Sequence, residues 1–248
     1  MKYSNKHNLP QSLYDAIVND TYDFKNDKDV FSVTTLISPP KIVQLKLRHH
    51  DEIEEDISGM AWILLGQSVH SVMERITDTD RIIEERLSEK VDGATISGKT
   101  DLYDNKIIND YKVTSTWTVI YNPKGKPEWV QQQNIYGWLW RKAGFEVNGL
   151  KIVAILRDFS LAKAKTTKKY PKIPFHVIDL PLWTMEETEK FIKERIAIQR
   201  LAQDMEDDEI PCCEKEDRWG DKRCNDYCSV NKFCNYYKGV NNGTTVKT

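Results

Sequence analysis

The chain has 248 residues, of which 40% are hydrophobic and 10% are aromatic. This length and composition predict a globular protein with a sizeable core, and they exclude a small disulfide-stapled fold and a wholly disordered chain. The formal net charge is −2, so a polyanionic partner would have to bind a local basic patch rather than the protein as a whole.

The amino-terminal residues contain no apolar segment typical of a signal peptide, and the longest apolar run, at residues 60–65, is too short to span a bilayer. We therefore expect a cytoplasmic protein that neither crosses nor binds a membrane. All five cysteines fall within residues 212–234. In a reducing compartment, clustered cysteines are more often metal ligands than disulfide partners.

We divide the chain into a helical or loop-rich lead-in (1–58), a core (59–205), a cysteine-rich segment (206–240) and a flexible tail (241–248). The core opens with a predicted helix over residues 59–76, where apolar side chains recur at intervals of three and four. Strands are predicted at 81–91, 94–103 and 106–114. Only Asp104 and Asn105 separate the last two strands, which indicates a tight hairpin.

A second helix is predicted over residues 128–143, closed by Gly144. Strands at 150–159 and 173–180 follow, on either side of a lysine-rich loop. Thr184 and Glu187 form a capping box for a helix over 185–203. This order of elements predicts an α/β fold with a mixed central sheet flanked by helices, followed by a cysteine-rich metal clasp at the carboxyl end.

Three charged residues of the predicted hairpin, Asp101, Asp110 and Lys112, project from one face of the sheet if the chain turns at residues 104–105. The two carboxylates would then be diagonal neighbours roughly 6 to 8 Å apart, close enough for one Mg²⁺ or Mn²⁺ ion to bridge. A nearby ammonium can hold a water molecule or stabilise charge on a phosphate. The alternative is a solvated face with an ordinary Asp–Lys pair. The opposite face is the expected core face, and it carries Leu102, Ile107, Tyr111 and Val113.

Four motifs in this region resemble those of the RecB-type branch of the PD-(D/E)XK nucleases, a branch that includes CRISPR-associated and AddAB-type nuclease domains. The resemblance runs in the expected order from about residue 59 to residue 180. This chain has Asp110 at the variable position and no proline before Asp101, which the branch tolerates. The motifs are Gly66-x-x-x-His70-x-x-x-Glu74, Gly98-x-x-Asp101, Asp110-Tyr111-Lys112 and Gln132-x-x-x-Tyr136.

The resemblance implies a restriction-endonuclease-like core and a Mg²⁺- or Mn²⁺-dependent deoxyribonuclease. It implies metal binding by His70, Asp101, Asp110 and the Tyr111 carbonyl, and catalysis assisted by Lys112. Gln132 and Tyr136 would position the DNA strand, since residues four apart share one helix face.

We expect an exonuclease that acts on single-stranded DNA ends in recombination, repair or phage DNA metabolism, in a bacterial or phage-infected cell. Its partners would be a helicase or recombination complex, or further copies of the chain. The alternative is a catalytically silent nucleic-acid-binding or assembly module of such a complex.

Several of these residues also have a purely structural interpretation. His70 would then be a core histidine, and Gln132 and Tyr136 ordinary helix residues. Glu74 is either a residue that orients His70 or a surface charge. Glu85, in the strand before Asp101, is expected to be an exposed acid.

Outside these motifs, a lysine-rich loop and a group of tryptophans are candidates for DNA contact. Phosphates would bind the loop at Lys163, Lys165, Lys168 and Lys169, although such a charge run is also typical of a solvated loop. Unpaired bases would stack on some members of a group of four tryptophans. We expect at least two of the four to be buried in the core. This group is Trp117, Trp129, Trp138 and Trp140.

The cysteine-rich segment supplies five thiols for one metal centre. Four thiolates can hold a tetrahedral Zn²⁺ ion or a [4Fe-4S] cluster, and the spacing does not separate the two. Related exonucleases with an iron–sulfur cluster usually take one cysteine from before the nuclease motifs, where this chain has none, so the fourth ligand would be Cys212 or Cys213. Alternatives are free thiols or a zinc-based docking element. The five are Cys212, Cys213, Cys224, Cys228 and Cys234.

Overall fold

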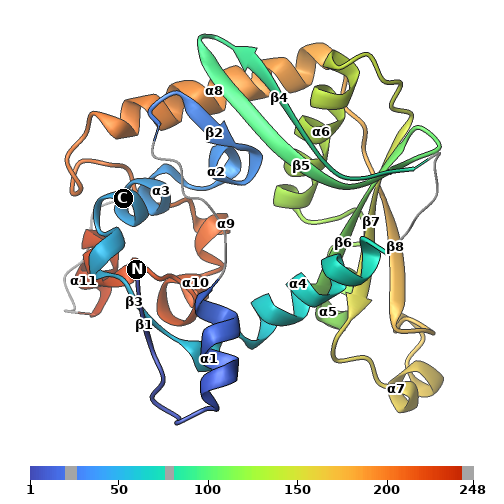
Figure 1. Cartoon of the computed structure of the whole chain (residues 1–248), viewed down its shortest axis with the longest axis horizontal. Coiled ribbons are helices and arrows are strands. Elements are labelled where there is room, and N and C mark those ends of the chain that lie inside the picture. Colours follow the sequence, from blue (N-terminus) through green and yellow to red (C-terminus); the bar gives the residue numbers. More distant parts are fainter. Residues whose placement is uncertain (20–26, 76–80, 242–248) are drawn as a thin grey trace. The chain divides into compact units, whose positions relative to one another are not determined.

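The computed structural model describes residues 1–19, 27–75 and 81–241, and the chain divides into two compact units. One unit comprises residues 31–37 and 62–193 and contains the sheet (Figure 1). The other comprises residues 1–30, 38–61 and 194–248, so the cysteine segment shares it with most of the lead-in. Residues 242–248 of the predicted tail and residue 76 of the first predicted helix lie outside the described residues.

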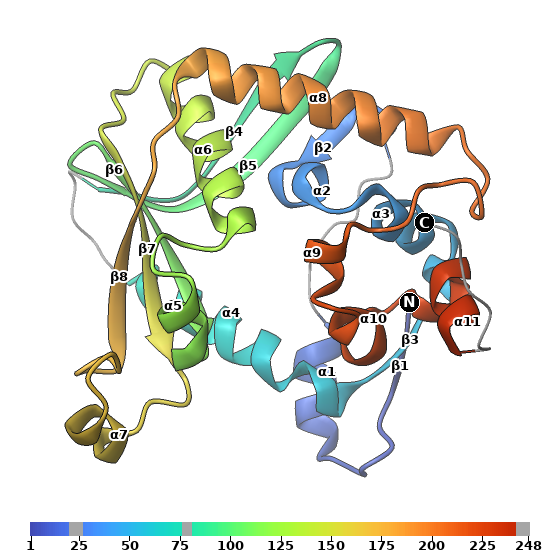
Figure 2. The ribbon, with the colours of Figure 1, turned by 180° about the vertical axis from the view of Figure 1, so that it is seen from behind.

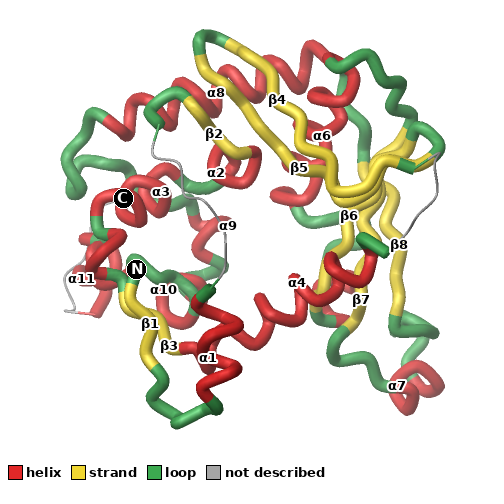
Figure 3. Tube along the Cα trace, in the orientation of Figure 1, coloured by secondary structure: helices red, strands yellow, loops and turns green. Residues whose placement is uncertain are grey.

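A six-stranded mixed sheet lies at the centre of the first unit (Figure 3). The strand order is β2-β5-β6-β7-β8, and β4 also pairs with β5. β6 and β7 are parallel, whereas β4–β5, β5–β6 and β7–β8 are antiparallel. The predicted α/β fold with a mixed central sheet is confirmed. The strands are β2 (Val30–Ser32), β4 (Ile82–Val91), β5 (Ala94–Asp104), β6 (Ile107–Thr114), β7 (Gly149–Leu156) and β8 (Phe175–Leu180).

The β5–β6 hairpin turns one residue later than the sequence predicted. Asp104 pairs with Ile107, and the two turn residues are Asn105 and Lys106, with φ of 50° and 63°. Positive φ at both central residues is the requirement of a type I′ turn, which matches the twist of the flanking strands, and Asn adopts such a φ readily. The register therefore shifts by two residues. A shift of two preserves which side chains share a face, whereas a shift of one would reverse them.

Helix α6 (Pro127–Lys142) packs against the sheet and supplies much of its core (Figure 2). Trp129, Trp138 and Trp140 are all buried on it, whereas Trp117 of α5 (Thr116–Tyr121) is 42% exposed. The expectation that at least two of these tryptophans are core is therefore confirmed, and only Trp117 presents a large open surface.

The predicted core face of β6 is wrong. Ile107, Tyr111 and Val113 are only partly buried, whereas Ile108 and Asp110 are buried. In the parallel ladder Asp110 pairs with Ile152 of β7, and Ile152 is fully buried. Asp110 therefore lies on the buried face, where a residue of α6 reaches it, as described below.

The remaining helices of this unit are the longer α4 and α8 and three short ones. The capping box predicted at the start of α8 is present: the Thr184 amide donates to Glu187 Oε2 (2.8 Å), and the Glu187 amide donates to Thr184 Oγ1 (3.1 Å). The sequence therefore placed the start of α8 correctly. These helices are α2 (Val33–Ile37), α4 (Ala61–Met73), α5, α7 (Leu161–Thr166) and the first part of α8 (Met185–Gln203).

The second unit is built mainly from helices around a small apolar core. Ile42, Leu45, Ile53 and Val230 are buried in this core, and Cys213, Cys228 and Cys234 pack against it. Buried Lys41 donates to the carbonyl oxygen of Ile210 (3.0 Å). The elements are β1 (Lys2–Ser4) parallel to β3 (Glu54–Asp56), α1 (Gln11–Val18), α3 (Pro40–Arg48), η1 (His50–Glu52), η2 (Ile57–Met60), the end of α8, α9 (Lys215–Arg218), α10 (Lys222–Asp226), η3 (Asn231–Phe233) and α11 (Asn235–Asn241).

Within residues 1–19, 27–75 and 81–241, no helix combines the length and the apolar character needed to cross a membrane.

Candidate functional site

The two carboxylates predicted to bind metal lie on neighbouring strands. Leu102 of β5 pairs with Asn109 of β6, and continuing this register by one residue places Asp101 opposite Asp110. They are thus direct rather than diagonal neighbours. The backbone amide of Tyr111 donates to Asp101 Oδ2 (2.8 Å), which fixes the carboxylate of Asp101 against β6.

Asp110 is 2% exposed and is held by two cationic or polar donors. The Nζ atom of Lys112 lies 3.0 Å from Oδ1 and 2.7 Å from Oδ2 of Asp110. The Nε2 atom of Gln133, a fully buried residue of α6, donates to Oδ1 (3.0 Å). Burial lowers the pKa of Lys112, but the charge and hydrogen bond of Asp110 outweigh this and raise it. Lys112 is therefore an ammonium at neutral pH.

Asp101 differs from Asp110 because no lysine neutralises it directly. Burial, and next the charge of Asp110, raises the pKa of Asp101 to about 7, while His70 and the Tyr111 amide act in the opposite direction. A carboxyl group with this pKa is readily ionised when a cation approaches. Two adjacent carboxyl groups, of which only Asp110 is paired with a lysine among the described ion pairs, favour binding of a further positive charge.

His70 lies beside Asp101 together with an acidic residue that the sequence analysis did not identify. His70 Nδ1 lies 3.3 Å from Glu84 Oε1 and 3.6 Å from Asp101 Oδ1. Ligand atoms of these three residues lie within 4.8 Å of one another, which is compatible with one metal ion. Glu84 also forms an ion pair with Lys99.

Glu84 reaches this position because the backbone of β4 is locally distorted. Its φ is +53°, in the left-handed region that non-glycine residues rarely adopt. Strand alternation does not predict such a distortion of the backbone. The sequence therefore could not show that Glu84, rather than its neighbour Glu85, reaches the site. Glu85 is exposed, as expected. Glu74 is also exposed, which favours its interpretation as a surface charge.

Gln132 and Tyr136 of α6 contact each other, and the tyrosine lies near the carboxylates. Gln132 Nε2 donates to the Tyr136 hydroxyl (3.0 Å), and both side chains are buried. Burial, and next the charge of Asp110, raises the pKa of Tyr136. In the structure it is Gln133, not Gln132, that contacts Asp110 directly. The phase of α6 decides which of two adjacent glutamines faces the strand, and the sequence did not resolve that phase.

The four candidate DNA-binding lysines are exposed. Lys163 and Lys165 are on α7, and Lys168 and Lys169 are in the loop that follows it. The Lys163 Nζ atom lies 5.7 Å from the centre of the Trp117 ring. None of these lysines contributes to the carboxylate site among the described contacts.

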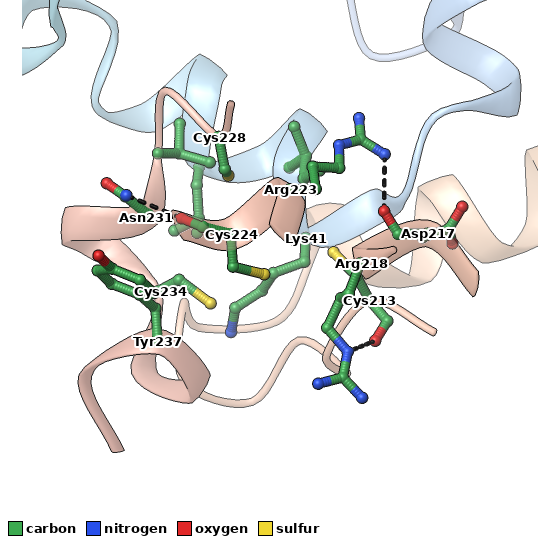
Figure 4. A pocket seen from close by; sticks show the side chains of 13 residues that line it. Lys41, Cys213, Asp217, Arg218, Arg223, Cys224, Cys228, Asn231, Cys234 and Tyr237 are labelled. Atoms are coloured by element: carbon green, nitrogen blue, oxygen red, sulfur yellow. Dashed lines mark hydrogen bonds between the residues drawn. The ribbon is translucent and has the colours of Figure 1, made fainter. Parts of the chain in front are cut away.

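Four of the five cysteines line one cavity in the second unit (Figure 4). Cys213 precedes α9, Cys224 is on α10, and Cys228 and Cys234 flank η3. Cys212 is exposed and does not line the cavity. Four of the thiols thus share one cavity, and Cys212 lies outside its lining.

The thiols of this cavity are held in the neutral form, and Lys41, Arg218 and Arg223 also line it. Burial, and then the neighbouring thiols Cys234 and Cys228, raises the pKa of Cys213 to about 12. The pKa of Cys224 and of Cys228 is raised as well, first by burial. Thiols of this kind become thiolates when a metal compensates their charge.

The donor set therefore fits a metal centre in chemistry and number. Among the described residues, no three cysteine sulfurs approach within 4.8 Å of one another, whereas the sulfurs of a tetrahedral Zn²⁺ site are about 4 Å apart, given bonds of about 2.3 Å. The four sulfur atoms would thus have to move closer together to bind a Zn²⁺ ion. A [4Fe-4S] cluster would need larger distances between the sulfur atoms than zinc does.

Comparison with known proteins supports the fold. No protein-family model and no curated protein matches the chain. The crystal structure of SSO0001 is 20% identical, with a TM-score of 0.56, and the match covers 90% of this chain and 94% of that one. This likeness shows a shared fold over nearly the whole length.

Two further structures resemble the chain more weakly. A candidate exonuclease from Eubacterium rectale is 13% identical, with a TM-score of 0.35 and coverage of 74% of this chain and 71% of that one. A phage-related exonuclease from Haemophilus somnus 129PT is 15% identical, with a TM-score of 0.33 and coverage of 78% and 80%. At these scores neither structure carries an argument about activity.

Proposed function

We propose that the protein is a divalent-metal-dependent deoxyribonuclease of the PD-(D/E)XK type, in its RecB-like branch. The observation that carries this proposal is the pair of adjacent carboxyl groups, the buried Asp110 and the partly buried Asp101, with the ammonium of Lys112 paired to Asp110. This arrangement leaves negative charge uncompensated where a hard cation would bind, and it supplies a fixed positive group for a phosphate.

The residues that would hold Mg²⁺ or Mn²⁺ are His70, Asp101, Asp110 and the Tyr111 carbonyl, to which we add Glu84. When bound, such a metal polarises the scissile phosphodiester and lowers the pKa of a coordinated water. The proposal for Glu84 is supported by its distance of 3.3 Å from His70 and by its positive φ, which orients the side chain into the site.

The other side chains of the site would orient the reacting groups. Lys112 donates a hydrogen bond to Asp110 in the free protein, and its ammonium would be available to a phosphate oxygen or to the attacking water if Asp110 held a cation. Gln133 holds Asp110 in place from α6. Gln132 and Tyr136, which are hydrogen-bonded to each other, would position the DNA strand.

We propose single-stranded DNA ends as the substrate and exonucleolytic cleavage as the reaction, in recombination, repair or phage DNA metabolism. The exposed lysines Lys163, Lys165, Lys168 and Lys169 would bind phosphates, with an affinity that falls as salt rises. A helicase or recombination complex, or a second copy of the chain, would be the partner. We place the protein in the cytoplasm because clustered cysteine ligands belong to a reducing compartment.

For the second unit we propose one structural metal centre, a [4Fe-4S] cluster or Zn²⁺, held by Cys213, Cys224, Cys228 and Cys234. The proposal is supported by the common cavity that these residues line, which excludes Cys212. Because three of the four, Cys213, Cys228 and Cys234, also pack against the core that contains Ile42 and Leu45, metal binding would stabilise the fold of this unit.

Incubation of labelled single-stranded and duplex DNA with the full chain and Mn²⁺ tests the proposed activity. We expect cleavage of the single strand by wild type and a loss of at least about a hundredfold in Lys112→Ala, because a group that stabilises developing charge contributes that much. Lys151→Ala is the matched control, since Lys151 lies in β7 of the same sheet and pairs with Asp179. Binding of DNA without metal-dependent cleavage would instead indicate a silent binding module.

A further inference from the structure

Two exposed aromatic rings lie side by side on α5, which begins directly after β6. Trp117 and Tyr121 are 42% and 75% exposed, and residues four apart share one helix face. Their ring centres are 5.9 Å apart, and the ring planes differ by 23°. Buried Tyr170 packs edge-on against Trp117, at 6.3 Å and 81°. Trp117 is therefore supported from the interior while a large part of its ring remains open.

Cationic groups lie against the exposed aromatic rings of this unit. The Lys163 Nζ atom is 5.7 Å from the Trp117 ring centre, and the Arg157 guanidinium is 4.2 Å from the ring centre of Trp62, which is 56% exposed. Residues 157–172 carry six lysines and arginines and a single acidic residue, Asp158. The Asp158 carboxylate accepts hydrogen bonds from the Thr116 amide and hydroxyl (2.6 and 2.8 Å).

The topology places these groups at one edge of the sheet. Because β6 and β7 are parallel, their carboxyl ends lie together: Thr114 pairs with Leu156, and the Arg157 amide donates to the Thr114 carbonyl (3.0 Å). Lys112 precedes Thr114 by two residues, or about 7 Å along the strand. A DNA strand with a phosphate at Lys112 can therefore extend toward Trp117.

We propose that Trp62, Trp117, Tyr121, Arg157 and Lys163, here called the aromatic edge, form a stacking platform for unpaired bases of single-stranded DNA. The proposal rests on the proposed nuclease function and assigns the surface that receives the strand next to the reacting phosphate. Open aromatic faces next to cations are what unpaired bases and their phosphates require, because every base offers a flat face and every linkage a negative charge.

The alternation of rings and cations distinguishes this surface from a protein-docking patch. Interfaces between proteins are depleted in lysine at their centre, whereas here a lysine lies directly over the most protected ring. Duplex DNA keeps its bases stacked inside and offers only its backbone. The aromatic edge should therefore prefer single strands over duplexes.

Binding of labelled oligo(dT) to the full chain without added divalent metal, measured by fluorescence anisotropy, tests the platform without cleavage. Trp117→Leu removes the aromatic face but keeps an apolar side chain, and we expect it to weaken binding at least about fivefold. Trp117→Phe retains a stacking face and should bind within about twofold of wild type. Phe145→Leu is the control, since Phe145 is also exposed (39%) but precedes the amino end of β7.

Equal binding by Trp117→Leu and wild type would overturn the platform, and so would equal affinity for duplex and oligo(dT), or an absence of oligo(dT) binding by wild type. The same proteins are then assayed for cleavage with Mn²⁺. Trp117-dependent binding without cleavage would refute the nuclease and leave the platform. Cleavage that accompanies Trp117-independent binding would refute the platform and leave the nuclease.

Discussion

Removal of the charge at position 101 should stabilise the metal-free protein at neutral and alkaline pH. Burial, followed by the charge of Asp110, raises the pKa of Asp101 from its ordinary 3.8 to about 7. A change of this size corresponds to about 4 kcal/mol of folding free energy. That is a large share of the stability of a typical domain, about 5 to 15 kcal/mol.

The sign of the stability difference follows from the direction in which folding changes the pKa of Asp101. Because the pKa of Asp101 is higher in the folded than in the unfolded chain, the folded state binds more protons between about pH 4 and pH 7, and stability falls as pH rises through this window. Asn at position 101 carries no charge, and its carbonyl can still accept the Tyr111 amide. Asp101→Asn should thus be more stable than wild type at pH 8, by up to about 4 kcal/mol, and should lose this advantage near pH 4.

Urea denaturation without added divalent metal, repeated from acidic to alkaline pH, measures this difference. The control is Asp179→Asn, because the Asp179 side chain is 82% exposed and an exposed pair contributes little. A lower stability of Asp101→Asn than of wild type at pH 8, or the same pH dependence in the two proteins, would refute this assignment of the raised pKa to Asp101.

Three further predictions concern the packing of Gly98, the ligand role of Glu84 and the cysteine cavity. Gly98→Ala would bring a Cβ atom within 2.8 Å of Tyr136 Cδ1, and it should cost about 1 to 3 kcal/mol of unfolding free energy in urea. Glu84→Gln should raise the Mn²⁺ concentration for half-maximal cleavage about tenfold or more, and an unchanged value would remove this residue from the ligand set. Cys213→Ser should lose the bound metal, while Cys212→Ser should keep it. Elemental analysis and visible absorption of protein purified without oxygen measure the metal content. Equal metal content in the two variants would contradict the proposal that the cavity cysteines, and not Cys212, bind the metal.

The parts of the site predicted from sequence were those that depend on strand alternation. Asp101, Asp110 and Lys112 were identified as one group because period-two alternation puts them on one face, and the error of two residues in the hairpin register left that grouping intact. The burial of that face was missed, because the choice of core face depends on where α6 packs. The apolar residues Ile107, Tyr111 and Val113 made the wrong face the better candidate by composition.

The parts that could not be predicted depend on local geometry that periodicity does not encode. Glu84 reaches the site only through a positive φ in the middle of a strand. Gln133, rather than Gln132, contacts Asp110 because of the rotational phase of α6. Cys213 and Cys212 are adjacent, so spacing treats them alike, and only the folded loop turns one of them toward the other three thiols.

The rate of single-stranded DNA cleavage during a Mn²⁺ titration, compared between wild type and Asp110→Asn, tests the central claim most directly. Asn keeps the shape of a residue that Lys112 and Gln133 both contact, but it removes the charge that a metal would bind. We predict no cleavage by wild type in EDTA, a saturable rise in rate with Mn²⁺, and a loss of at least about a hundredfold in the variant. Cleavage by wild type without added metal, or equal rates for the two proteins, would contradict the account.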